Sequence, residues 1–288
     1  MKPILSIDDL EDASASDIEE ARKALSVKPR LYARLKEMGR KVGLTRAEYI
    51  RIMSDVTEQD CTHCRGTGKV AREKPREIGV IHPSSAHKCR LRLYYDVTGE
   101  FAPVEAIKYE LQVTFAIGHA IHAVVQKALD LELGKNFSAE AKCDLNGLVR
   151  GNTDGDMWLP EAHGVLEIKT MGSEFAGLSK PKDDHFIQAM GMYATALDAP
   201  FVTYLYISKE WPYDMKEFVE VYDPKIFDRW SRYKGAFVQK ALEDGSPPIA
   251  DAEPAECAEC PYAYKCPQKL EKKGGKAFAH GNSRGGSR

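Results

Sequence analysis

The chain has 288 residues, of which 43% are hydrophobic, and its formal net charge is −2. This length and composition support a well-buried globular interior, and they exclude a membrane-spanning protein because no stretch approaches the roughly 20 apolar residues of a transmembrane helix. The near-neutral charge argues neither for nor against nucleic acid, because acidic residues 8–20 balance basic residues 65–92. We expect a cytoplasmic protein, since the first residues lack the apolar segment of a secretion signal. The seven cysteines then indicate metal sites or buried thiols rather than disulfides.

The chain divides into four predicted segments. Residues 17–55 carry apolar residues at helical spacing, which predicts a helical N-terminal appendage over residues 1–56. Residues 57–78 are rich in glycine, cysteine and charge, which predicts a knuckle or linker. The main domain is expected at 79–270. The basic tail at 271–288 has few apolar residues to pack and is expected to be disordered.

Within the main domain the hydrophobic pattern predicts helices and strands in a defined order. Tyr109–Leu133 has apolar positions at steps of three and four, which predicts an amphipathic helix with His122 facing inward and His119 outward. The later elements are three strands, a helix, two strands and a last helix, expected at Ser138–Asp144, Leu148–Leu159, Val165–Thr170, Phe186–Leu197, Phe201–Ser208, Lys216–Tyr222 and Asp223 to about Asp244. The order of helix, three-stranded meander, helix and strand predicts an α/β fold with a mixed sheet.

Two acids and a lysine are predicted to meet in the meander. Glu167 and Lys169 share one face of the third strand because side chains alternate along a strand. Asp154 on the preceding strand can face them, since paired residues lie about 5 Å apart at Cβ; Asp156 shares its strand face and competes for this place. Carboxylates hold Mg²⁺ or Mn²⁺, which polarises a phosphoryl oxygen, and a lysine orients water, so the trio suits phosphodiester hydrolysis. An isolated Glu-x-Lys is common on protein surfaces, so its context decides.

This order of residues resembles that of the PD-(D/E)XK nuclease superfamily, and within it the RecB-like branch that includes AddB and the CRISPR-associated exonucleases. The matching features, in chain order, are Gly118 with His122, Gly151 with Asp154, Glu167 with Lys169, and Gln188 on the following helix. The resemblance implies a metal-dependent nuclease whose metal ligands are the side chains of His122, Asp154 and Glu167 and the backbone carbonyl of Ile168. It also implies that Lys169 acts on the attacking water and that Gln188 steadies the site.

The family's following helix carries a tyrosine four residues after the glutamine. Here Met192 holds that place and Tyr193 lies one residue further. An α-helical period turns Tyr193 to a different part of the helix from Gln188. Tyr193 is nevertheless the candidate for the family's catalytic tyrosine.

Four cysteines bracket the main domain. Cys257, Cys260 and Cys266 lie within ten residues, with prolines that stiffen the loop, a spacing that suits a tetrahedral metal or a cubane cluster. In RecB-like exonucleases with iron–sulfur clusters the fourth cysteine lies upstream, in a serine-rich entry followed by basic and aromatic residues. The segment 82–95 resembles that entry, which implies Cys89 as the fourth ligand. Four thiolates accept Zn²⁺ as well as [4Fe–4S], and the resemblance favours iron–sulfur.

The residues around Cys89 are also candidates for contact with DNA. The basic and aromatic side chains that could follow a single strand are Lys88, Arg90, Arg92, Tyr94 and Tyr95. Alternatively, they only flank the metal site.

A second cysteine motif, Cys61–Gly68, resembles one zinc knuckle of the DnaJ type, but its partner knuckle is missing. Cys61 and Cys64 therefore either bind Zn²⁺ with further ligands or belong to a loop without metal. The further ligands would be Cys143, His82, His87 or a second chain. Cys143 itself lies in a predicted strand, where a buried small residue is expected.

Taken together, these features predict a metal-dependent DNA nuclease. Exonuclease action on DNA ends or single strands is the family's usual behaviour, in recombination, repair or phage and CRISPR-type DNA processing, with a partner protein in some cases. One alternative is an endonuclease on the same core. The other is a non-catalytic DNA-binding or assembly subunit, which would have no need of Asp154, Glu167 and Lys169.

Overall fold

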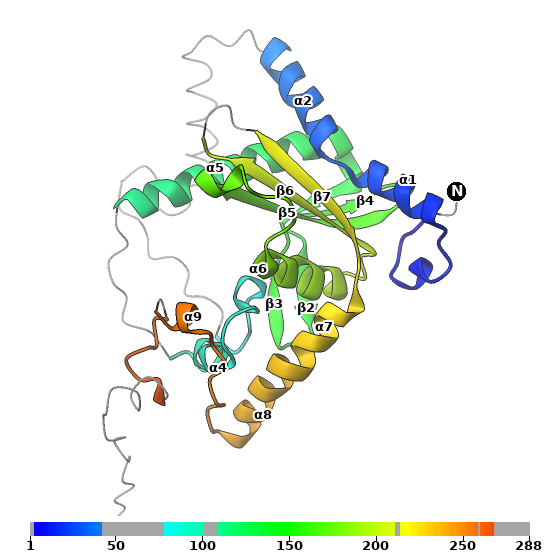
Figure 1. Ribbon diagram of the computed structural model, residues 1–288. Helices are drawn as coiled ribbons and strands as arrows, with labels where there is room; N and C mark the ends of the chain where they lie inside the picture. Colours follow the sequence, from blue (N-terminus) through cyan, green and yellow to red (C-terminus); the bar gives the residue numbers. More distant parts are fainter. Residues whose placement is uncertain (1–2, 42–77, 101–108, 211–213, 259, 268–288) are drawn as a thin grey trace, which may run out of the picture.

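A computed structural model of the protein describes residues 3–41, 78–100, 109–210, 214–258 and 260–267. Its centre is a five-stranded sheet made of β1 (Phe137–Ala139), β4 (Gly155–Trp158), β5 (His163–Met171), β6 (Phe201–Ser208) and β7 (Met215–Val221), in that order. Strand β5 pairs antiparallel with β4 and parallel with β6, and β6 pairs antiparallel with β7. This confirms the predicted α/β fold with a mixed sheet (Figure 1).

Each of the first two predicted strands of the meander is divided by a bend into two shorter strands. The outer parts, β2 (Lys142–Leu145) and β3 (Val149–Asn152), form a separate two-stranded sheet, whereas β1 and β4 belong to the main sheet. At the bend Glu140 has a φ of 54°, and the Thr153 N–H donates to the Ala141 carbonyl over 2.9 Å. The ladder between β4 and β5 therefore stops at Gly155 opposite Leu166, and β5 continues beyond it.

Helices cover both faces of the sheet (Figure 1). They are α1 (Ala15–Leu25), α2 (Lys28–Lys41), α4 (Arg90–Val97), α5 (Tyr109–Leu133), α6 (Asp183–Phe186), the π-helix η5 (Ile187–Ala194), α7 (Pro224–Trp230), the π-helix η6 (Ser231–Gly235), α8 (Ala236–Asp244) and α9 (Pro254–Ala258). Short 3₁₀ turns lie at η1 (Asp8–Leu10), η2 (Pro83–Ser85), η3 (Gly134–Asn136) and η4 (Ser173–Phe175). In the part of the chain that the structure describes, no helix is long and apolar enough to cross a membrane.

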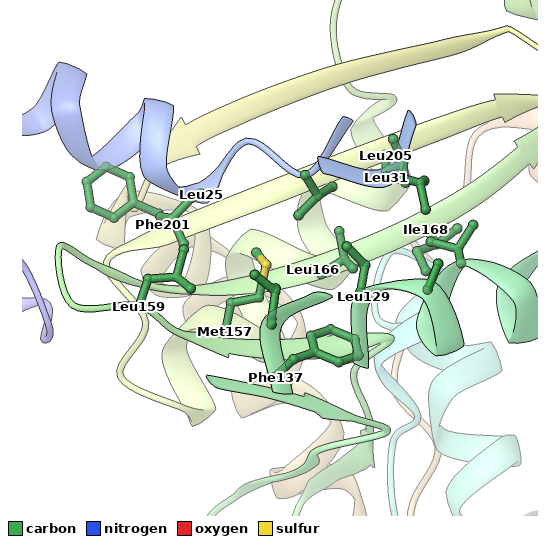
Figure 2. Close-up of a cluster of buried hydrophobic side chains, with 14 of the residues drawn as sticks. Leu25, Leu31, Leu129, Phe137, Met157, Leu159, Leu166, Ile168, Phe201 and Leu205 are labelled. Atoms are coloured by element: carbon green, nitrogen blue, oxygen red, sulfur yellow. The ribbon is translucent and has the colours of Figure 1, made fainter. Parts of the chain in front are cut away.

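A hydrophobic core lies on each face of the sheet because β5 and β6 are covered on both sides. On one face Leu129 of α5 packs with Leu166 and Ile168 (Figure 2). On the opposite face Met190 of η5 packs with Tyr204 of β6. The alternation along β5 that buries Leu166 and Ile168 against α5 thus turns Glu167 and Lys169 toward η5.

The described N-terminal residues belong to the first of these cores. Ile4 bridges to Ala162 beside the sheet, and Leu25 and Leu31 are fully buried in the same cluster as the sheet residues (Figure 2). The Glu217 carboxylate of β7 accepts the backbone N–H of Val27, over 2.7 Å, at the junction of α1 and α2. The helical pattern predicted these helices but not their partner, which is the core on this face of the sheet. The Cys61/Cys64 knuckle and the tail at 271–288 lie outside the described residues.

We expect Leu25→Ala to lower the free energy of unfolding by about 3 kcal/mol, because it leaves a cavity in the core. Leu25 is fully buried, and its methyl groups lie 3.0 Å from where a Cβ on Gly164 would stand. Chemical denaturation measures the change, with Leu5→Ala as the control because Leu5 is 36% exposed. An unchanged unfolding free energy for Leu25→Ala would show that α1 does not share the core.

Candidate active site

Strand β5 carries the acid and the base. Glu167 is 1% exposed and forms an ion pair with Lys169, two residues along the same strand face. Burial raises the pKa of Glu167 to about 7, against the opposing effect of the Lys169 ammonium, and the Asp154 charge raises it further. Although burial favours the neutral amine, the Glu167 carboxylate raises the pKa of Lys169. Lys169 therefore remains protonated, and Glu167 keeps its proton to a higher pH than an ordinary glutamate.

Asp154 lies in the bend directly before β4, opposite the part of β5 that extends past the ladder. Its Oδ2 accepts the backbone N–H of Ile168 over 2.7 Å, and Gln126 of α5 donates to its carbonyl over 2.8 Å. The N–H and C=O of one strand residue point to the same side, so the Ile168 carbonyl is directed toward Asp154. The bend thus places Asp154 beside Glu167 at the open edge of β5.

Helix α5 brings His122 to the same place. Its Nδ1 lies 3.2 Å from Asp154 Oδ1, whereas His119 is exposed. One turn earlier, a Cβ on Gly118 would stand 3.2 Å from Thr170 Oγ1 of β5, so a larger residue would crowd the contact between helix and strand. Gly118 therefore lets α5 approach β5 closely enough for His122 to reach Asp154.

Asp156, the competitor of Asp154, has different partners. Its Oδ1 lies 2.8 Å from Nε2 of the fully buried His163, and its Oδ2 accepts the Trp158 indole N–H over 2.8 Å. The Trp158 and His163 rings stack with their centroids 3.7 Å apart. Both carboxylate oxygens of Asp156 are engaged within this packed group, so the structure separates it from the site around Asp154.

Gln188 and Tyr193 meet because their helix has a π-helical segment. Gln188 Nε2 donates to the Tyr193 hydroxyl over 2.9 Å, and both side chains are buried. A π-helix repeats its contacts at five residues, so it brings together residues that an α-helix would separate. The α-helical expectation for Tyr193 was therefore wrong, and the displacement of the tyrosine by one residue from the family spacing was the signal of the extra residue. Burial, followed by the Glu167 charge, raises the pKa of Tyr193.

A further group beside Lys169 has no counterpart in the sequence interpretation. The Tyr206 hydroxyl of β6 lies 3.0 Å from His185 Nδ1 and accepts the Lys182 N–H over 3.1 Å. Burial lowers the pKa of His185 to about 4, although Asp184 opposes this, so the imidazole is neutral at physiological pH. In the sequence, this group is indicated by the tyrosines at alternate positions of β6, the strand that pairs with β5.

The chemistry of these residues fits a hard divalent cation. Glu167 Oε2 is buried and has no hydrogen-bond partner among the described residues, which is costly for a carboxylate unless a proton or a cation satisfies it. The Asp154 carboxylate and the His122 imidazole are oxygen and nitrogen donors of the kinds that bind divalent cations. Within the described ranges, no three His, Cys, Asp or Glu side chains lie close enough together to hold a metal ion. Instead, Glu167 contacts Lys169, and Asp154 contacts His122.

The four candidate cluster cysteines line a single cavity of about 370 Å³, between α4 and the segment that carries α9. Cys89, at the start of α4, donates its backbone N–H to Glu256 Oε1 over 2.7 Å, and Arg90 donates its own to Asp251 Oδ1 over 2.7 Å. Burial raises the pKa of the Cys89 thiol. Carboxylates of the C-terminal segment thus cap α4 beside this cavity.

Two of the residues expected to follow DNA are part of this packing. Tyr94 and Tyr95 are 8% and 7% exposed, and the Tyr95 ring lies 5.1 Å from the Tyr262 ring and under the Lys265 ammonium. They are therefore not available to stack on bases, which corrects the interpretation of the tyrosines. The Arg90 guanidinium lies 4.4 Å from the Phe237 ring centroid, and Arg92 ion-pairs with Asp96, while Lys88 is half-buried. Of the two readings, flanking the cysteine cavity fits these side chains better.

Comparison with known proteins gives structural likeness only. No family model matches the chain, and no curated protein matches it. The fold is similar to the crystal structure of SSO0001, with 18% identity and a TM-score of 0.44 over 77% of this chain and 97% of that one. It is also similar to LHK-Exo, an alkaline exonuclease from Laribacter hongkongensis, alone and in complex with dAMP, each with 15% identity and a TM-score of 0.44 over 58% of this chain and 90% of that one. At these identities and TM-scores, a functional assignment rests on the residues of the site.

Proposed function

We propose that the chain is a metal-dependent DNA nuclease of the RecB-like PD-(D/E)XK type, acting as an exonuclease on DNA ends or single strands. The observation that carries the proposal is the arrangement at the open edge of β5, where buried Glu167 pairs with Lys169 and Asp154 binds the Ile168 N–H. A buried carboxyl whose pKa is raised to about 7 costs stability above that pH, and such groups cluster at functional sites.

Each residue has a role that its surroundings support. A Mg²⁺ or Mn²⁺ ion, held by His122, Asp154, Glu167 and the Ile168 carbonyl, would supply Lewis-acid polarisation of the scissile phosphate. The Lys169 ammonium donates hydrogen bonds to the attacking water and to the charge that develops on the phosphoryl oxygens. The buried pair of Gln188 and Tyr193 would steady the site near Glu167, whose charge acts on Tyr193.

We further propose that Cys89, Cys257, Cys260 and Cys266 hold a [4Fe–4S] cluster, with Zn²⁺ as the alternative. The support is that all four cysteines line one cavity. Such a cluster would fix the C-terminal segment on α4. A reducing, cytoplasmic compartment would suit cysteines that bind a metal rather than form disulfides. Anaerobic purification followed by visible absorption and metal analysis tests this point, and a colourless protein that contains only zinc would replace iron–sulfur by zinc.

Digestion of linear and covalently closed DNA tests the proposed activity. An exonuclease needs an end, so we expect linear duplex and single-stranded DNA to be degraded with Mn²⁺ or Mg²⁺ while closed circles stay intact. Cleavage of closed circles at a similar rate would identify an endonuclease on the same core. Binding of both DNAs without cleavage would favour the alternative of a non-catalytic subunit, which binds DNA or assembles with partner proteins in recombination, repair or DNA processing.

A further inference from the structure

Tyr204 of β6 lies beside Glu167 in the sheet. The two residues are direct partners in the parallel register of β5 and β6, so both side chains point to the face that η5 covers. Tyr204 is fully buried. Its hydroxyl oxygen interacts with the Met190 backbone in η5 in the sense that lowers a phenol pKa, which is as an acceptor, and its O–H has no acceptor among the described residues.

Glu167, in turn, has a carboxylate oxygen that lacks a hydrogen-bond donor. Its Oε1 faces Lys169, whereas its Oε2 is buried and has no hydrogen-bond partner in the described part of the chain. A buried donor or acceptor without a partner destabilises the folded state. A phenol whose O–H has no acceptor and a carboxylate oxygen, Glu167 Oε2, that has no donor therefore stand on neighbouring strands.

The next tyrosine on the same strand face shows that this is not a general property of β6. The Tyr206 hydroxyl has two partners, His185 and the Lys182 N–H. If Tyr204 served only to fill space, a phenylalanine would do so without burying an unpaired hydroxyl. Burial and the Glu167 charge raise the pKa of Tyr204, so its hydroxyl keeps the proton that it would donate.

We propose that Tyr204 is a positioning residue whose hydroxyl donates a hydrogen bond to the ionised Glu167 carboxylate and holds it in the orientation that binds the divalent cation. The inference rests on the proposed nuclease function. The Tyr193 hydroxyl accepts the Gln188 N–H and so already has one partner, whereas the Tyr204 O–H has no acceptor among the described residues. Tyr204 would thus act through Glu167 and would not contact the substrate.

Tyr204→Phe and the matched control Tyr206→Phe test this role, because each removes one hydroxyl from the same face of β6. Mn²⁺ affinity is measured by calorimetry, and cleavage of linear DNA is followed as a function of Mn²⁺ concentration. For Tyr204→Phe we expect about tenfold weaker Mn²⁺ binding and recovery of the cleavage rate at saturating Mn²⁺. For Tyr206→Phe we expect unchanged Mn²⁺ affinity and a lower Tm, because it loses two hydrogen bonds.

The outcomes separate this inference from the proposed function. A Tyr204→Phe protein that binds Mn²⁺ as tightly as the wild type overturns the positioning role, whatever its Tm, while leaving the nuclease intact. A wild-type protein that neither binds Mn²⁺ nor cleaves DNA overturns the proposed function and the inference with it.

Discussion

Lys169→Ala is expected to lower the rate of DNA cleavage by about 10³-fold or more, with a folded protein remaining. Lys169 is the cation that contacts the buried Glu167, and preorganised charge in such a site is worth more than in water. Its loss removes the donor that orients water and offsets phosphoryl charge. Rates on linear DNA with saturating Mn²⁺, for protein whose fold is checked by circular dichroism, measure the effect.

The same substitution has a consequence for stability that depends on pH. The folded pKa of Glu167, about 7, lies above its ordinary value of 4.5, so this group's contribution to stability is present below pH 4.5 and is lost as the pH rises through 7. Without Lys169 the pKa of Glu167 in the folded state rises further. The metal-free variant should therefore lose more stability between pH 5 and pH 8 than the wild type.

Lys180→Ala is the matched control for both measurements, because its side chain is 79% exposed and pairs only weakly with Asp183. Normal cleavage by Lys169→Ala would refute the role of this lysine.

We expect Asp154→Asn to impair DNA cleavage and Asp156→Asn to impair stability, although the two acids are only two residues apart. Asp154→Asn is expected to lower cleavage by about 10³-fold or more with little change in stability, because its carboxylate faces His122 and the Ile168 N–H at the open edge. Asp156→Asn is expected to cost about 2 kcal/mol, because an amide cannot accept hydrogen bonds at both of its atoms from His163 and Trp158.

Chemical denaturation and cleavage rates per folded molecule, measured on both variants, distinguish the two acids. Asp156→Asn should cleave at the wild-type rate once the folded fraction is taken into account. The reverse pattern, in which Asp156→Asn is inactive and Asp154→Asn is active, would move the site to Asp156.

Local periodicity was enough to predict most of the fold. The bounds of α5, Tyr109–Leu133, follow from apolar spacing alone, and the alternation in β5 correctly placed Glu167 and Lys169 on one face. What a helix packs against is not local information. An amphipathic pattern shows that α1 and α2 bury one face, but only the three-dimensional structure shows that this face meets α5 and the sheet.

The candidate site shows the same limit at the level of single residues. The pairing of Gln188 with Tyr193 depends on a π-helical segment, which the α-helical period used for the sequence does not include. Tyr94 and Tyr95 sit in a basic and aromatic stretch that is typical of nucleic-acid binding, yet they are buried against the cysteine cavity. Composition shows which side chains are present, whereas burial depends on segments more than 150 residues away, such as the one that carries Tyr262.

The central claim is that the site around Asp154, Glu167 and Lys169 hydrolyses DNA with the help of a divalent cation. Its most direct test is the release of nucleotides from end-labelled linear DNA by the wild type with Mn²⁺, by the wild type with excess EDTA, and by Asp154→Asn with Mn²⁺. We expect release only from the wild type with Mn²⁺. Intact DNA in that sample, or equal release by Asp154→Asn, would contradict the assignment.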